Sequence, residues 1–223
     1  MSTLYVVATP IGNLDDITMR ALSVLKSVDV IAAETPSVAR KLLSAYGISG
    51  KKIITVREAN REVAIQRIRE LLDESFNVAL ISDAGTPGIS DPGAGIIDQL
   101  LAEGYEVVPV PGPSAITAML SVFPLREPWV FLGFLPKRKG RRKRILEKFL
   151  DIGVSILFYE TPYKIMETLS ILEEVAPEVQ MCLGREITKR YEEFLVGAPG
   201  DIRSVLADRK DIKGEIVCSL RVE

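Results

Sequence analysis

Short apolar runs alternate with amphipathic stretches along the first half of the chain. The runs are typical of buried strands and cover residues 4–9, 29–33, 52–56, 78–81 and 105–110. Between them, apolar residues recur at helical spacing, and Thr35 followed by Pro36 predicts the N-cap and first residue of one helix. Strands that alternate with helices predict a mostly parallel sheet with helices on both faces.

The second half of the chain has a different pattern. Two apolar runs are each followed by a helical pattern, and three later runs follow one another closely enough for antiparallel pairing. In chain order they cover residues 129–134, 155–159, 179–183, 191–196 and 215–222. A rigid Pro-Gly-Pro corner at residues 111–113 separates the halves. The sequence therefore predicts an α/β chain of two domains, residues 1–112 with a mostly parallel sheet and residues 113–223 with a mixed sheet.

A loop rich in glycine and proline follows the run at residues 78–81. It covers residues 82–93 and begins with a serine and the carboxylate of Asp83. Glycine lets the backbone approach a ligand, proline fixes the loop's shape, and open α/β sheets bind ligands at the carboxyl ends of their strands. A turn without a ligand would have the same composition. The chain has neither a G-x-G-x-x-G nor a G-x-x-x-x-G-K-[ST] motif, which argues against a nicotinamide dehydrogenase or a P-loop NTPase. A ligand with an adenine, a ribose and an amino-acid-like end suits this loop better than a polyphosphate does.

The amino-acid composition of the chain further limits the functions and reactions that it can have. The chain is 47% hydrophobic and 26% charged with a net charge of −2, which is typical of a globular protein. It has no apolar run of about 18 residues and no N-terminal signal pattern, so we expect a cytoplasmic location. Histidine is absent, which excludes His-dependent triads and zinc sites; no metal is expected. Cys182 and Cys218 lie in apolar runs and are expected to be buried, reduced thiols.

Positive charge is concentrated in residues 137–144. This segment holds seven of the 28 Lys and Arg residues, and without it 21 basic residues remain against 30 acidic ones. Such asymmetry is typical of a surface that contacts a phosphate backbone, although a solvated charge run at a helix start would look the same. Nearby Trp129, Phe131 and Phe134 are expected in the core rather than as stacking platforms. The predicted phosphate contacts are Lys137, Arg138, Lys139, Arg141, Arg142, Lys143 and Arg144.

Motifs spread over nearly the whole chain resemble those of one known family. They are Ala8-Thr9-Pro10-Ile11-Gly12-Asn13-Leu14, residues 82–93, residues 109–115, Gly133-Phe134-Leu135-Pro136, Phe158-Tyr159-Glu160-Thr161-Pro162 and Arg185-Glu186-Ile187-Thr188-Lys189. In this order they resemble the small-subunit (16S) ribosomal RNA 2′-O-methyltransferase I family of the tetrapyrrole methylase superfamily. The resemblance implies a two-domain tetrapyrrole methylase-like fold, a homodimer, and S-adenosylmethionine held in the cleft between the domains.

The resemblance also implies a reaction and a set of site residues. The reaction is methyl transfer to the ribose 2′-hydroxyl of a cytidine in small-subunit ribosomal RNA, as naked RNA or within the assembled subunit. Matched to the family's motifs, the cofactor-binding residues are Pro10, Asp83, Ala84, Gly85, Thr86, Ile89, Ser114, Ala115, Tyr159 and Glu160. Because the chain has no histidine, the candidates for a catalytic role, including a general base, are Glu34, Glu160, Glu186 and Lys189.

Two other functions stay open. The chain departs from the family's usual pattern after residue 34, where Thr35-Pro36-Ser37 stands in place of Asp-Thr-Arg. A methyltransferase of the same fold that acts on a small metabolite is one alternative. A non-catalytic RNA-binding relative is the other, and binding of S-adenosylmethionine separates the enzymes from it.

Overall fold

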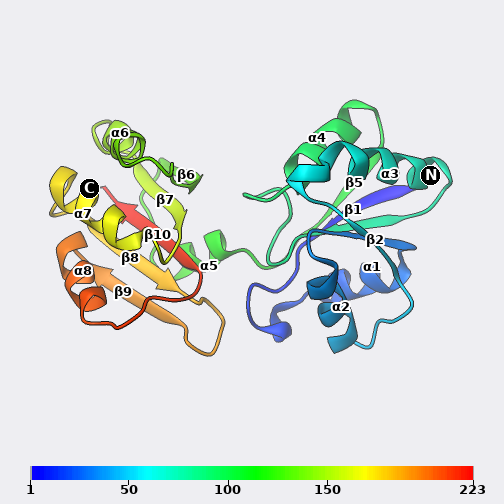
Figure 1. Ribbon diagram of the computed structural model, residues 1–223, viewed down its shortest axis with the longest axis horizontal. Coiled ribbons are helices and arrows are strands. Elements are labelled where there is room, and N and C mark those ends of the chain that lie inside the picture. Colours follow the sequence, from blue (N-terminus) through cyan, green and yellow to red (C-terminus); the bar gives the residue numbers. More distant parts are fainter. Residues whose placement is uncertain (1, 223) are drawn as a thin grey trace. The chain divides into compact units, whose positions relative to one another are not determined.

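The computed structural model describes residues 2–222 and divides into two compact units, residues 1–114 and residues 115–223 (Figure 1). Each unit is an α/β structure with its own five-stranded sheet. Among the described residues, no helix is long and apolar enough to cross a membrane.

The first unit contains one parallel sheet. Its elements are β1 (Thr3–Val7), η1 (Leu14–Asp16), α1 (Met19–Ser27), β2 (Val30–Ala33), α2 (Pro36–Ala45), β3 (Lys52–Thr55), η2 (Glu58–Asn60), α3 (Arg61–Asp73), β4 (Val78–Ile81), α4 (Gly93–Ala102) and β5 (Glu106–Val110). The strand order is β3-β2-β4-β1-β5, and every neighbouring pair is parallel. The carboxyl ends of all five strands therefore lie along one edge.

Helices cover both faces of this sheet, as the uninterrupted apolar strands predict. Helices α3 and α4 pack with one set of strand residues, including Leu4, Ala32 and Leu80. Helices α1 and α2 pack with the alternate set, including Val7 and Ile81. Figure 1 shows the two helix pairs on opposite sides of the strands. Strands β2 and β4 are buried along their whole length, which fixes the position of the loops that follow them.

The second unit contains a mixed sheet. Its elements are α5 (Ala115–Val122), β6 (Trp129–Phe134), α6 (Lys139–Leu150), β7 (Ser155–Glu160), α7 (Ile165–Val175), β8 (Gln180–Arg185), β9 (Glu193–Gly197), α8 (Pro199–Ala207) and β10 (Ile216–Arg221). The strand order is β6-β7-β10-β8-β9. Only the pair β6–β7 is parallel; β10 runs antiparallel to β7 and β8, and β9 runs antiparallel to β8.

The two faces of the second sheet are covered differently. Helices α6, α7 and α8 share one core with Ile156 and Phe158 of β7. Because side chains alternate along a strand, Tyr159 lies on the other face. Helix α5 lies on that other face, where Met119 packs so closely on Gly184 that an added Cβ would approach its Cε to 2.8 Å.

Both cysteines are buried free thiols, as expected. Burial raises the pKa of Cys182 to about 11 and also raises the pKa of Cys218, so both stay protonated and unreactive at neutral pH.

Candidate functional site

The loop after β4 is fixed to two neighbouring strand ends. Thr9 and Gly85 form an antiparallel bridge whose N–H to O distances are 2.9 and 3.1 Å. Gly85 has φ +79°, a left-handed conformation that glycine adopts without strain. The Thr86 hydroxyl donates a hydrogen bond to the Pro113 carbonyl at 3.1 Å. The ends of β4, β1 and β5 therefore hold this loop in one defined shape.

The carboxylate of Asp91 closes the far side of the same loop. It accepts hydrogen bonds from the Gly88 N–H at 3.0 Å and from the Gly93 N–H at 2.7 Å. A Cβ added to Gly93 would lie 2.8 Å from Asp91 Oδ1, so this position requires glycine. Asp91 thus folds the loop onto the start of α4.

Asp83 connects this loop to the loop after β2. Its Oδ1 accepts a hydrogen bond from the Thr35 N–H at 3.1 Å, and its Oδ2 accepts one from the Thr35 hydroxyl at 2.7 Å. Thr35 makes no side-chain cap to α2, contrary to expectation, because its hydroxyl is used for Asp83. Strands β2 and β4 are neighbours in the sheet, and this brings residues 48 positions apart together.

Three carboxylates gather at this edge of the first sheet. A small pocket here is lined by Glu34, Val56, Leu80, Ile81, Ser82, Pro87, Asp91, Pro92 and Gly93. Burial raises the pKa of Glu34, the charges of Asp83 and Asp91 raise it further, and Arg57 opposes them. The local field is therefore negative.

A negative edge fits S-adenosylmethionine better than a phosphate-rich cofactor. The sulfonium and ammonium groups of S-adenosylmethionine outweigh its one carboxylate, so the molecule is a net cation and is attracted to this field. Polyphosphates would be repelled. The donor and acceptor groups of the edge fit the cofactor that the sequence motifs imply.

The predicted cofactor residues fall in different places. Pro10 and Gly85 are buried beside the Thr9–Gly85 bridge, Asp83 and Ala84 are exposed, and Ile89 is half-buried. The others lie further along the chain: Ser114 ends the first unit, and Ala115, Tyr159 and Glu160 belong to the second.

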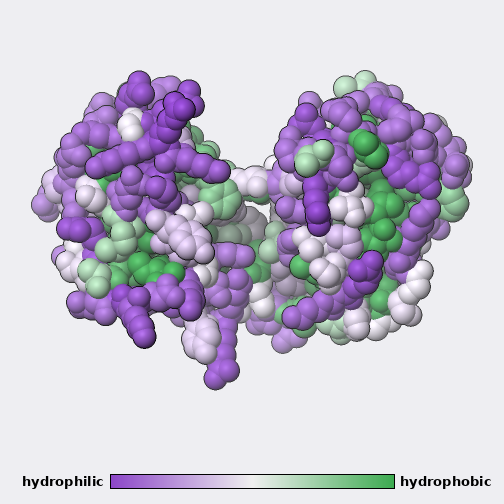
Figure 2. All heavy atoms as spheres, in the orientation of Figure 1, coloured by the Kyte–Doolittle hydropathy of each residue, from purple (hydrophilic) through white to green (hydrophobic). Residues whose placement is uncertain are grey.

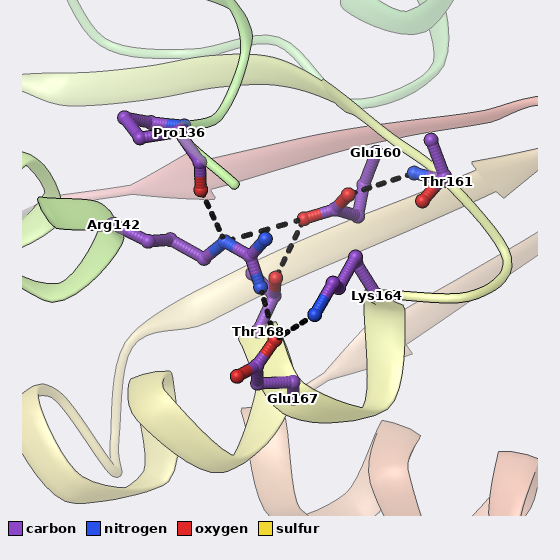
Figure 3. Close-up of polar contacts among 7 residues, drawn as sticks. All are labelled: Pro136, Arg142, Glu160, Thr161, Lys164, Glu167 and Thr168. Atoms are coloured by element: carbon purple, nitrogen blue, oxygen red, sulfur yellow. Dashed lines mark hydrogen bonds and ion pairs between the residues drawn. The ribbon is translucent and has the colours of Figure 1, made fainter. Parts of the chain in front are cut away.

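Arg142 corrects one expectation about the basic segment. Its side chain is only 1% exposed and points into the second unit, so it is not available to a phosphate backbone (Figure 3). It donates to the Pro136 carbonyl at 3.2 Å and pairs with Glu167 at 3.0 Å. Its Nε also lies 3.9 Å from Glu160 Oε2. Arg142 therefore ties the start of α6 to the end of β7 and to α7.

The remaining basic residues of the segment differ in availability. Figure 2 shows hydrophilic side chains gathered over α6. Lys143 is half-buried and paired with Glu174 and Glu147. Within residues 2–222, no ion pair to a carboxylate joins the exposed members of the segment, which are Lys137, Arg138, Lys139, Arg141 and Arg144.

Glu160 is a structural residue in its immediate surroundings. It is 4% exposed, and its carboxylate accepts hydrogen bonds from the Thr168 hydroxyl at 2.6 Å and from the Thr161 N–H at 2.8 Å (Figure 3). With Arg142 nearby, its oxygens hold the turn that follows β7 in place. This arrangement explains why a carboxylate is found in a buried position.

Glu186 and Lys189 pair with each other in the loop after β8. Burial raises the pKa of Glu186, but hydrogen bonds from Lys189 and from the Glu215 N–H outweigh it, so this pKa lies below its ordinary value. Burial lowers the pKa of Lys189, but Glu186 and Glu215 outweigh that effect and raise it. A carboxylate with a lowered pKa and an ammonium with a raised one are poor bases.

The aromatic residues before the basic segment are less buried than expected. Phe134 is 56% exposed and Trp129 is 37% exposed, whereas Phe131 is half-buried. The expectation that all three belong to the core is wrong for Phe134 and for Trp129. The sequence signal that could have identified the exposed ring of Phe134 is Gly133, because an isolated glycine inside an apolar strand suggests a bulge.

Comparisons with known proteins identify the family. A model of the Tetrapyrrole (Corrin/Porphyrin) Methylases matches residues 3–202. A protein of Coprothermobacter proteolyticus, named ribosomal RNA small subunit methyltransferase I, is 45% identical over 214 residues, which are 96% of this chain and 95% of that protein. The chain belongs to the small-subunit ribosomal RNA methyltransferase I family. The Bacillus subtilis protein of the same name is 41% identical over 96% of this chain and 73% of its own length.

Solved structures confirm the tetrapyrrole methylase-like fold of this methyltransferase I family member. Diphthine synthase matches with a TM-score of 0.75 and 13% identity, over 99% of this chain and 90% of its own. A cobalt precorrin-4 methyltransferase matches with a TM-score of 0.74 and 14% identity, over 97% of this chain and 94% of its own. At such identities the likeness concerns the fold alone.

Proposed function

We propose that the chain uses S-adenosylmethionine to methylate small-subunit ribosomal RNA at the ribose 2′-hydroxyl of a cytidine. The observation that carries this proposal is the similarity, over nearly the full length, to relatives named ribosomal RNA small subunit methyltransferase I. The negative edge of the first unit and the exposed cations of the second support it, because they suit a cationic cofactor and a polyanionic substrate respectively.

The geometry supports a proposed role for several individual residues. S-adenosylmethionine, when bound, supplies a methyl group attached to a positively charged sulfur. The loop held by Asp83 and Thr35 would bind and orient the cofactor, together with Pro10, Ala84, Gly85, Thr86 and Ile89. Holding the hydroxyl in line with the carbon–sulfur bond supplies much of the acceleration. Glu34, which lines the pocket at this edge and whose pKa is raised by burial, would accept the proton of the substrate hydroxyl as the methyl group is transferred.

The exposed cations of the basic segment would contact the RNA backbone. These are Lys137, Arg138, Lys139, Arg141 and Arg144, without Arg142, which is buried. A homodimer, a cytoplasmic location and cofactor contacts from Ser114, Ala115 and Tyr159 stay predictions.

Calorimetry combined with methyl transfer tests the proposal. We expect S-adenosylmethionine and S-adenosylhomocysteine to bind the full chain, and labelled methyl groups to appear in unmodified small subunits or in their RNA. Absence of binding of both molecules would assign the chain to the non-catalytic alternative. Binding with methyl transfer to a small metabolite and none to RNA would assign it to the other alternative.

A further inference from the structure

A bulge in β6 turns one aromatic ring to a face it would not otherwise reach. Phe131 pairs with Leu157 and Phe134 pairs with Tyr159, so β6 holds one more residue than β7 between these pairs. Gly133, inside this irregularity, has φ +62°. In an unbroken strand, residues three apart lie on opposite faces, whereas here Phe131 and Phe134 lie on the same face.

Tyr159 lies between the two phenylalanine rings. Its ring centroid is 5.0 Å from that of Phe131 at an interplanar angle of 74°, and 5.4 Å from that of Phe134 at 55°. Val130 and Leu132 pack into the core on the side of α6 to α8, so the three rings lie on the opposite face. Phe134 is therefore supported from one side by Tyr159, while 56% of the residue's surface remains exposed.

The exposed ring and the basic segment lie at the same end of the sheet. Phe134 is the last residue of β6, and the first cation, Lys137, follows three residues later. Arg142 draws the start of α6 to the ends of both strands, because it bonds the Pro136 carbonyl after β6 and lies beside Glu160 at the end of β7. Figure 3 shows Arg142 pointing from the helix to these two groups. These contacts of Arg142 with the Pro136 carbonyl and Glu160 turn its side chain inward, while Lys139 and Arg141 remain exposed.

An exposed aromatic ring and unpaired cations at one end of a sheet together resemble the arrangement with which proteins hold single-stranded nucleic acid. The ring stacks on a base, and the cations contact the adjacent phosphates. We propose that Phe134, backed by Tyr159, is a stacking platform for an unpaired base of the RNA substrate, with its phosphates on Lys139 and Arg141. This inference rests on the proposed function and adds a base contact to it.

Charge favours RNA over a second copy of this chain as the occupant of this face. In a two-fold interface centred on Phe134, the two basic segments would approach each other and repel. A polyanionic strand instead meets charges of opposite sign. A copy of the chain is the competing occupant, and RNA binding together with the oligomeric state of a Phe134 variant distinguishes the two.

Fluorescence titration of a single-stranded oligoribonucleotide that contains 2-aminopurine tests the platform. With the full-length chain, Phe134→Leu is expected to weaken binding about tenfold and to remove the quenching that stacking causes. Phe134→Trp is expected to restore both. Phe76→Leu is the matched control, because it makes the same change at a ring that is 40% exposed in the first unit, and it should bind as the wild type does.

The salt dependence of RNA binding distinguishes the contribution of the Phe134 ring from that of the cations. Phe134→Leu should leave the slope of log affinity against log salt unchanged, whereas Arg141→Gln should reduce it by about one contact. Wild-type affinity and quenching in Phe134→Leu, with Phe76→Leu normal, would overturn the inference. Sedimentation that shows Phe134→Leu converting a dimer to a monomer, with RNA affinity unchanged, would assign the face to a second copy. Cofactor binding is measured on the same samples, and its absence in the wild type would count against the proposed function rather than against the platform.

Discussion

Thr35 holds both carboxylate oxygens of Asp83, one through its backbone N–H at 3.1 Å and the other through its hydroxyl at 2.7 Å. The contact joins the loops after β2 and β4 at the edge where the cofactor is expected to bind. It also gives Thr35 a role beyond the start of α2.

Thr35→Val removes the hydroxyl hydrogen bond and keeps the side chain's shape. We expect the dissociation constant for S-adenosylmethionine to rise about tenfold, because a hydrogen bond to a charged group stabilises by about 1.5 kcal/mol. Calorimetry measures the change. Ser37→Ala, an exposed substitution two residues later, is the control and should leave the constant unchanged. Equal affinity of Thr35→Val and the wild type would mean that the Asp83–Thr35 contact does not shape the cofactor loop.

Arg142 and Arg141 are adjacent in sequence, but their substitutions should affect different properties: stability for Arg142 and RNA binding for Arg141. Arg142→Met leaves Glu160 buried without its nearby cation and is expected to lower the free energy of unfolding by about 3 kcal/mol. Arg141→Met is expected to stay within about 0.5 kcal/mol of the wild type but to weaken RNA binding. Urea unfolding and RNA titration of the two variants check this pair. The assignment fails if Arg141→Met is the less stable variant.

Glu34 should control the acid side of the activity profile. Its pKa is raised by burial and by the charges of Asp83 and Asp91, so kcat/KM should rise with pH through a value above the ordinary 4.5. Glu34→Gln is expected to lower kcat by about 100-fold and to remove this rise. Glu186→Gln, in which a paired carboxylate with a lowered pKa is changed, is the comparison. A Glu34→Gln enzyme with the wild-type profile would exclude Glu34 as the base.

Acid stability should depend on Glu193. A hydrogen bond from Arg209, with a second from Arg185, lowers the pKa of Glu193 from 4.5 to about 2. Because the folded state holds this proton less tightly than the unfolded state, the stabilisation is complete above pH 4.5 and is lost as the pH falls towards 2.

Glu193→Gln should therefore be less stable at neutral pH, by on the order of 2 kcal/mol, and should lose less stability on acidification. Thermal unfolding between pH 7 and pH 2 measures both effects. The exposed Glu178→Gln variant should follow the wild type. Parallel acid-unfolding curves of Glu193→Gln and the wild type would contradict the role of this ion pair.

The strand and helix pattern was predictable because burial on both faces leaves a clear apolar signature. Strands β2 and β4 are wholly buried and read as uninterrupted apolar runs. The loop after β4 was also found from its glycines, and the structure shows why two are needed: Gly85 adopts φ +79°, and Gly93 has no room for a Cβ beside Asp91.

Contacts between distant residues were not predictable in the same way. The hydroxyl of Thr35 is used for Asp83 rather than for capping α2, a choice that depends on which strands are neighbours. Arg142 stands four residues before the buried Leu146, a spacing that indicates the inner face of α6, yet its place in a basic run obscured that signal. Phe134 was assigned to the core because it ends an apolar run, and Gly133 inside that run, which marks the bulge, was not taken into account.

The proposed activity of this chain is methylation of a ribose in small-subunit RNA. The most direct test is to incubate the wild-type chain with labelled S-adenosylmethionine and unmodified small subunits, and then to map the label by alkaline hydrolysis. We predict label at a cytidine whose 3′ linkage resists alkali, because a methylated 2′-oxygen cannot attack the adjacent phosphate. Label on a base, with the adjacent linkage still cleaved by alkali, would contradict the claim.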